Sequence, residues 1–228
     1  MVVITVSSQF GAGGPAVGKQ LAERLDMHYL DKELIHRVAL DLKIPDEKVA
    51  EFDEARHSPL RGFLSTVFDF AALRRGVDEV AGEVAESSYD DRDEIPYDYR
   101  VQGWIDKDIY RTMMARVMSA VGDRGGAVIK GRGSQWILRD VPHAIHLRFI
   151  GDVEDRVART MERRGIDAAE ARKLVDEMDR RGAEFVRSYF EFDLTDPTLY
   201  HLILNTSKLP PEECLELLVH LVREREAG

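Results

Sequence analysis

The chain has 228 residues, of which 44% are hydrophobic and 32% charged, and its formal net charge is -10. This composition is typical of a soluble globular protein, and the length fits one large domain or one core with a sizeable insertion. An acidic chain repels nucleic-acid backbones and anionic membranes, so we expect neither as a partner. The one cysteine, Cys214, excludes an internal disulfide and a cysteine-rich zinc site and favours a cytoplasmic location.

The N-terminal segment combines a short apolar run with a glycine-rich turn. Residues 2–6 are rich in β-branched side chains, and a glycine cluster at residues 11–14 follows them. Apolar residues then recur at helical spacing, so the pattern predicts a strand, a loop and a helix that is regular from Gly18. Further along we expect a strand at 28–31 and helices at 32–42 and 46–55, whereas 56–103 has no regular pattern.

The rest of the chain alternates helices with strands. We expect a helix at 105–121, strands at 127–130, 144–150 and 200–204, two arginine-bearing helices between 153 and 190, and a last helix at 211–226. Such alternation predicts an α/β fold with a parallel sheet covered by helices on both faces. In such folds ligands bind at the carboxyl ends of the strands, which is where the glycine loop lies.

The glycine loop carries the strongest motif. Gly13 to Lys19 has the spacing G-x-x-x-x-G-K, in which backbone N–H groups hold phosphates and the lysine reaches the outer ones. Position 20 is Gln, where most such loops have a Ser or Thr that meets Mg²⁺. Since Gln20 is a poor direct ligand, we expect nucleotide oxygens and water to hold the metal, and we assign no protein metal ligand. A glycine turn without a ligand is the alternative interpretation.

The same loop also fits a second motif. Gly11, Gly13 and Ala16 match the dinucleotide fingerprint G-x-G-x-x-G/A, and Asp31 follows at the distance expected for a ribose-binding acid. This keeps a Rossmann-type oxidoreductase as an alternative. A lysine after Gly18 has no task in dinucleotide binding, however, and no second βαβ half with a hydride-transfer residue is visible. We therefore favour the phosphate loop.

Arginines cluster in the C-terminal half. Arg156, Arg159 and Arg163 share one helix face, and Arg180 and Arg187 follow seven residues apart. Guanidinium groups match the geometry of phosphate oxygens. Solvated helices with intrahelical ion pairs would explain such runs if they stood alone. Together with a phosphate loop, they favour phosphoryl transfer.

Several segments together resemble the cytidylate kinase-like family of phosphate-loop kinases. They are residues 4–14 with Gly18 and Lys19, and residues 29–35, 128–132, 155–159, 179–181 and 200–206. The resemblance implies a three-layer nucleoside monophosphate kinase fold in one domain, 1–228, with a five-stranded parallel sheet. It also implies a helical monophosphate-binding insertion at 43–104 and a helical lid region at 156–190.

The resemblance also implies roles for individual residues. Those expected to bind ATP are Gly11, Ala12, Gly13, Gly14, Gly18, Lys19, Gln20 and Arg156. Those expected to bind the acceptor are Asp31, Arg37, Arg132, Asp179 and Arg181. Those expected to act on the transferring phosphoryl group are Lys19, Arg132, Arg159, Arg180 and Arg187. No general base is needed, because an acceptor phosphate oxygen is already a nucleophile.

Two positions depart from the family's pattern. Gly133 stands where its members carry an aspartate that helps to read cytosine, and Lys32 stands where they carry a serine. Losing a base-reading contact weakens discrimination between acceptors. We therefore expect transfer of the γ-phosphoryl group of ATP, with Mg²⁺, to a phosphorylated small molecule, with CMP as the first candidate. A non-catalytic nucleotide sensor is a further alternative, which Gln20 and Gly133 favour; the oligomeric state stays open.

Overall fold

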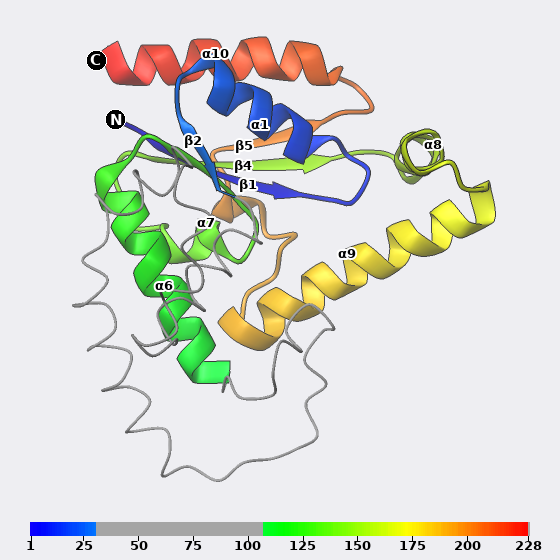
Figure 1. Cartoon of the computed structure of the whole chain (residues 1–228), viewed down its shortest axis with the longest axis horizontal. Helices are drawn as coiled ribbons and strands as arrows, with labels where there is room; N and C mark the ends of the chain where they lie inside the picture. The colour runs from blue at the N-terminus through cyan, green and yellow to red at the C-terminus, as the bar shows by residue number, and fades with distance from the viewer. Residues whose placement is uncertain (31–106, 228) are drawn as a thin grey trace, which may run out of the picture. The chain divides into compact units, whose positions relative to one another are not determined.

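The computed structural model describes residues 1–30 and 107–227, and these contain a five-stranded, all-parallel sheet (Figure 1). The strand order is β2-β3-β1-β4-β5. The strands are β1 (Val3–Ser8), β2 (His28–Leu30), β3 (Ala127–Lys130), β4 (Ala144–Ile150) and β5 (Leu202–Asn205). The chain divides into two compact units, and the sheet belongs to the one made of Met1–Lys32 and Val121–Gly228.

The central strand β1 is buried because both of its neighbours are parallel strands covered by other elements. Val3 pairs with Ala127 of β3 and with Ala144 of β4, and Val3, Ile4 and Val6 have no exposed surface. Parallel sheets read as near-continuous apolar runs for this reason. The β-branched run at the N-terminus therefore forms the middle of the sheet.

Two helices cover one face of the sheet, α1 (Gly14–Arg24) and α10 (Pro211–Ala227) (Figure 1). Their apolar side chains join those of β1 and β4 in one core cluster, which includes Leu21, Phe149 and Leu218. The Nη2 of Arg24 also lies 3.0 Å from a carboxylate oxygen of Glu216, and this ion pair links the exposed sides of α1 and α10.

The other described elements connect the strands in chain order. They are α6 (Lys107–Arg124), α7 (Ser134–Ile137), α8 (Val153–Arg164), α9 (Ala168–Phe190) and the short 3₁₀ helix η3 (Pro197–Leu199). Gly165 ends α8 in the left-handed conformation, and the side chain of Asp167 caps α9 by accepting the Glu170 N–H at 2.9 Å. A sharp turn therefore sends α9 back from α8.

The five predicted strands and the parallel sheet are confirmed. The predicted start of the first helix is wrong: α1 begins at Gly14 rather than near Gly18. Its first turn contains Pro15, which is favourable at the start of a helix. That turn lacks the regular apolar spacing from which the helix was predicted. The pattern also misses α7 and η3, which are too short for a helical period. The expected helices at 32–42 and 46–55 and the insertion at 43–104 lie outside the described residues. Among the described helices, none is long and apolar enough to cross a membrane.

Candidate functional site

The conformation of the loop between β1 and α1 depends on its glycines. Gly11 and Gly13 have φ angles of 81° and 80°, in the left-handed region. A Cβ atom on Gly11 would lie 2.6 Å from the carbonyl oxygen of Arg156, and one on Gly14 would lie 2.7 Å from Ser8 Oγ. The loop backbone therefore turns tightly and packs directly on its neighbours.

This turn leaves backbone N–H groups ready for a ligand. Within residues 1–30 and 107–227, no protein acceptor is recorded for the N–H groups of Gly11, Gly13 and Gly14, whereas those of Ala16 and Val17 donate to the Gly13 carbonyl at 3.0 and 3.1 Å. The N-terminus of the 11-residue helix α1 adds its positive dipole end. Such an arrangement binds anions, above all phosphate.

The structure changes the position of the predicted lysine. Gly18 and Lys19 do not close the loop; they lie in the second turn of α1. Gly18 is a packing residue, because a Cβ atom there would come within 3.3 Å of Val6 and 3.4 Å of Tyr29. Lys19 and Gln20 are exposed, and Lys19 lies about 7.5 Å along the helix axis from Gly14. Gly14 and Pro15, rather than Gly18 and Lys19, therefore start the helix. The ATP-binding roles expected for Gly18, Lys19 and Gln20 stay predictions.

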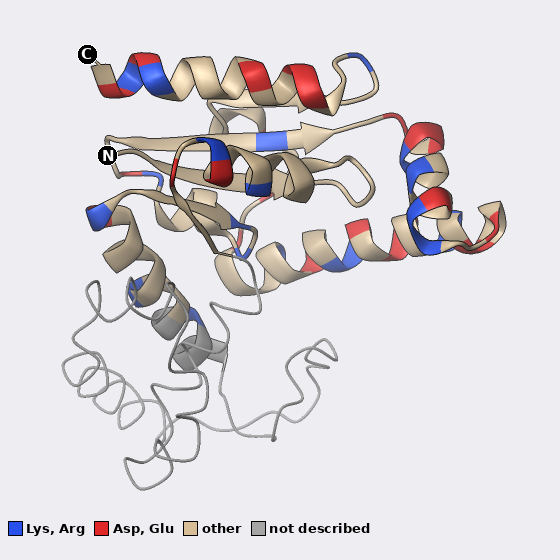
Figure 2. Cartoon of the chain, turned by 45° about the horizontal axis from the view of Figure 1, so that its top comes forward, with Lys and Arg blue, Asp and Glu red and all other residues tan. Residues whose placement is uncertain are grey.

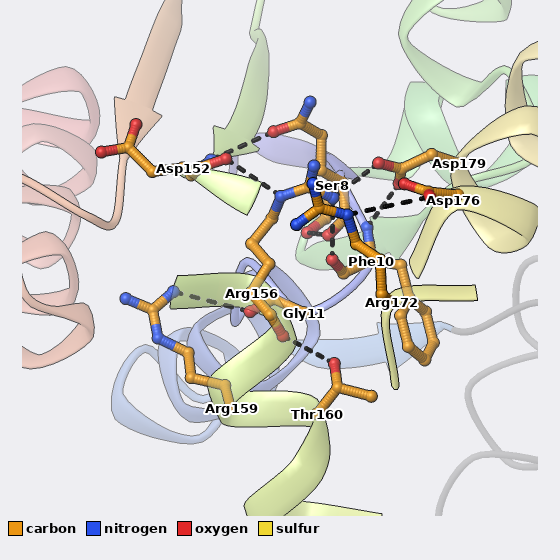
Figure 3. Close-up of polar contacts among 12 residues, drawn as sticks. Ser8, Phe10, Gly11, Asp152, Arg156, Arg159, Thr160, Arg172, Asp176 and Asp179 are labelled. Atoms are coloured by element: carbon orange, nitrogen blue, oxygen red, sulfur yellow. Dashed lines mark hydrogen bonds and ion pairs between the residues drawn. The ribbon is translucent and has the colours of Figure 1, made fainter. Parts of the chain in front are cut away.

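Two arginines of α8 contact backbone carbonyls of the loop (Figure 3). Arg156 is buried and donates through Nη1 to the Phe10 carbonyl at 3.1 Å and through Nε to the Gly151 carbonyl at 2.9 Å. Arg159 donates to Thr206 Oγ1 at 2.8 Å, and its Nη1 lies 3.5 Å from the Gly11 carbonyl. The helix face predicted from the arginine spacing therefore faces the glycine loop.

Two further arginines of α8 lie over the aromatic ring of Phe10, a residue of the loop. The guanidinium carbons of Arg163 and Arg164 lie 5.8 and 5.9 Å from the centre of the ring, within the range of a cation–π interaction. Figure 2 shows that α8 and α9 carry basic and acidic residues side by side. The basic residues of α8 thus include several that gather around the loop.

Asp179 of α9 ties the loop to both helices (Figure 3). Its Oδ1 accepts the Phe10 N–H at 2.8 Å, and its Oδ2 lies 2.5 Å from Nη1 of Arg156. The expected partner of Asp179 was the acceptor, and that of Arg156 was ATP. In this structure both side chains bind the loop backbone and each other, so they hold the loop in place.

The other lid residues on α9 face solvent. Arg180 donates to Glu184 at 2.7 Å, Arg181 pairs with Glu177, and Arg187 is exposed. The pairs of Arg180 and Arg181 are the intrahelical ion pairs that the alternative interpretation of the arginine run describes. The catalytic and acceptor-binding roles expected for these three residues stay predictions.

Arg132 lies in a second tight turn, after β3. Gly131, Arg132 and Gly133 all have positive φ angles, and the Arg132 guanidinium lies 5.0 Å from the ring centre of Phe185 on α9. A Cβ atom on Gly133 would lie 2.8 Å from the ring of Phe190. A side chain at this position would therefore require a strained backbone and a shift of the Phe190 ring. Asp31, Lys32 and Arg37 lie outside the described residues.

The sequence pattern missed a polar stripe on β4. His146 and Arg148 alternate with the core residues Ile145, Leu147 and Phe149, and both are buried. His146 bonds to Thr5 Oγ1 at 2.8 Å, and burial together with the charge of His201 lowers its pKa to about 4. Two polar residues in an otherwise apolar strand were the signal that could have identified this stripe.

Comparisons with known proteins agree with this architecture. The model of the "Cytidylate kinase-like family" matches residues 3–208. A cytidylate kinase from Aeropyrum pernix is 31% identical over 107 residues, which is 46% of this chain and 60% of that protein. A uronate isomerase from Corynebacterium glutamicum is 28% identical over 103 residues, which is 45% of this chain but 20% of that protein. The chain thus matches less than two thirds of either relative.

One solved structure shares the fold over nearly its whole length. It is the crystal structure of an uncharacterized protein from Eubacterium ventriosum ATCC 27560, with a TM-score of 0.65 and 19% sequence identity. The superposition covers 98% of this chain and 99% of that one. At this identity the likeness supports the fold alone.

Proposed function

The chain belongs to the cytidylate kinase-like family, and we propose that it transfers the γ-phosphoryl group of ATP to a phosphorylated small molecule, with CMP as the first candidate. The kinase family and fold support phosphoryl transfer in general. The observation that carries the proposal is the set of N–H groups of Gly11, Gly13 and Gly14 without recorded protein acceptors, at the start of α1 and beside the arginines of α8. CMP comes from the name of the Aeropyrum pernix relative.

In this proposal the loop binds the donor phosphates through its backbone. The N–H groups of residues 11–14 and the dipole of α1 would hold the β- and γ-phosphates. Arg159 would supply the cation next to them, because its Nη1 already lies 3.5 Å from the Gly11 carbonyl. Arg156 and Asp179 would keep the loop in this conformation rather than contact the nucleotide.

Transition-state charge would be spread by arginines instead of a loop lysine. Arg159 would act from the donor side and Arg132 from the acceptor side, while Arg187 would require a movement of α9. The acceptor phosphate is the nucleophile, and orientation with charge neutralisation supplies the catalysis. Mg²⁺ would enter as part of the substrate, chelated by ATP oxygens. Among the described residues no group of three His, Cys, Asp or Glu side chains could hold a metal ion.

The strand order argues against the dinucleotide alternative. In the classic Rossmann order β1 lies beside β2, whereas here β1 lies between β3 and β4. The non-catalytic alternative has one observation in its favour, since Gly14 and Pro15 occupy the positions where a phosphate-loop lysine and serine would start the helix. The single cysteine, Cys214, is buried and fits the reducing cytoplasm in which we place the reaction.

ADP formation with a panel of acceptors tests the proposal. The protein would be incubated with ATP and Mg²⁺ and with CMP, UMP, AMP, dCMP or a sugar phosphate. We expect ADP to form with at least one monophosphate and to be nearly absent without an acceptor. Arg159→Met should remove this activity, whereas Arg223→Met, at an exposed position of α10, should not. Wild-type protein that binds ATP but phosphorylates none of these acceptors would support the sensor instead.

A further inference from the structure

Arg148 is a buried cation in the middle of the sheet. It is 7% exposed, and it is the one arginine of β4. Phe149 packs on the face covered by α1 and α10, so the alternation of the strand directs Arg148 to the opposite face. Ser7 of β1 is its partner in the strand register. Both residues lie near the carboxyl ends of their strands, where parallel sheets bind ligands.

The partners of Arg148 are neutral. Its Nη1 donates to Ser7 Oγ at 2.8 Å and to the Tyr200 hydroxyl at 3.4 Å, and its guanidinium lies 5.5 Å from the centre of the Tyr200 ring. Tyr200 in turn donates to the Leu194 carbonyl at 2.9 Å. Within residues 1–30 and 107–227, no carboxylate forms an ion pair with Arg148. Of its three guanidinium nitrogens, only Nη1 has a hydrogen-bond partner among these residues.

The charge of Arg148 acts on the exposed carboxylate of Asp193. Hydrogen bonds from the backbone and side chain of Thr195 lower the pKa of Asp193 most, and the charges of Arg187 and Arg148 lower it further. These two arginines therefore act on the same stretch of chain between α9 and η3.

A buried acceptor atom lies in the same network. Gln135 of α7 is 1% exposed and donates through Nε2 to the Tyr200 hydroxyl at 3.4 Å. Its Oε1 has no hydrogen-bond partner in the structure. Buried polar atoms are nearly always paired, so an unpaired one indicates a missing ligand or water. A ligand at this position would offer both an anionic group to Arg148 and an O–H or N–H donor to Gln135.

We propose that Arg148, Tyr200 and Gln135 form an anion-binding site that takes the phosphate group of the acceptor. The assignment to the acceptor rests on the proposed function. A guanidinium with free N–H groups binds phosphate oxygens through charge-assisted hydrogen bonds, and burial strengthens them. The glycine loop starts close by, because the Gln9 N–H donates to the carbonyl of Phe149, the residue after Arg148. An anion held there would lie at the same edge of the sheet as the donor phosphates.

Titration with inorganic phosphate tests the site directly. The full chain would first be saturated with the ATP analogue AMP-PNP and Mg²⁺, so that phosphate cannot enter the glycine loop. We expect Arg148→Met to weaken phosphate binding about tenfold or more, and Arg148→Lys to weaken it less because the charge remains. The matched control is Arg139→Met, since Arg139 is exposed and lies over the ring of Trp136. Equal phosphate affinity in wild type and Arg148→Met would overturn the proposal.

Two further readouts separate binding from a structural role. Without ligand, Arg148→Met should melt at the wild-type temperature or above it, because an unpaired buried cation is removed. Failure of this variant to fold would overturn the proposal, as it would show that Arg148 serves packing. With CMP as acceptor, KM for CMP should rise while KM for ATP stays unchanged. Failure of AMP-PNP to bind wild type would instead count against the proposed function. Phosphate binding that depends on Arg148 could then be measured by comparing Gly13→Val, whose loop is blocked, with the double variant that also carries Arg148→Met.

Discussion

The contact between Asp179 and the glycine loop predicts a measurable loss of stability when its charge is removed. Asp179→Asn keeps an oxygen for the Phe10 N–H but leaves the buried guanidinium of Arg156 without its carboxylate. Breaking a fully buried ion pair costs about 3–5 kcal/mol. The Asp179 side chain is 28% exposed and Arg156 keeps two carbonyl partners, so we expect about 2 kcal/mol.

A loss of this size lowers the melting temperature by about 4–8 °C in a domain of this length. Circular dichroism during thermal and urea unfolding would measure it, with Glu184→Gln as the control, because the pair of Glu184 with Arg180 is exposed and is worth about 0.5 kcal/mol or less. Arg156→Met should cost less stability in the Asp179→Asn background than in wild type. An Asp179→Asn variant as stable as the Glu184→Gln control would refute the reasoning.

Three further predictions follow from other parts of the site. Lys19→Ala should change kcat/KM for ATP by less than about threefold, because Lys19 is exposed in the second turn of α1, whereas Arg159→Met should lower it about 100-fold, because Arg159 lies against the Gly11 carbonyl; steady-state kinetics would show which residue matters, and equal losses would contradict this prediction. Gly133→Ala should cost about 2–4 kcal/mol in urea unfolding, because a positive φ and the Phe190 ring both oppose a side chain; a neutral effect would contradict the packing explanation. The lowered pKa of His146 should make the protein less stable as the pH falls from 6.5 to 4, because the unfolded chain binds the proton first. The contribution of His146 approaches about 3 kcal/mol, so the loss measured by urea unfolding at each pH should be clearly smaller in His146→Gln, and an equal loss would contradict the assignment.

The sequence predicts those parts of the molecule that local patterns encode. The runs at 127–130 and 144–150 became β3 and β4 with the expected bounds, because buried parallel strands need continuous apolar residues. The arginine spacing on α8 also predicted a common face, and that face does meet the loop. Helical periodicity is a property of neighbouring residues, so it can be read without knowing the fold.

Contacts between distant residues could not be predicted in this way. Asp179 and Phe10 are 169 positions apart, and nothing in either segment indicates that a carboxylate will accept the loop N–H. The prediction that the helix begins near Gly18 was wrong for a related reason, because the motif fixes the spacing of residues but not where the helix begins. The burial of Arg148 was not predicted, because a charged residue in a strand is typical of an exposed edge strand, and the sequence does not show that β4 lies between two other strands.

The central claim is that the backbone of the glycine loop binds a nucleotide triphosphate. Calorimetric titration of wild type and Gly13→Val with ATP and Mg²⁺, and in parallel with NADH and NADPH, tests it most directly. A valine at a φ of 80° cannot keep the loop conformation. We expect ATP to bind wild type but not Gly13→Val, and neither nicotinamide cofactor to bind. ATP binding of equal strength in both proteins would contradict the central claim.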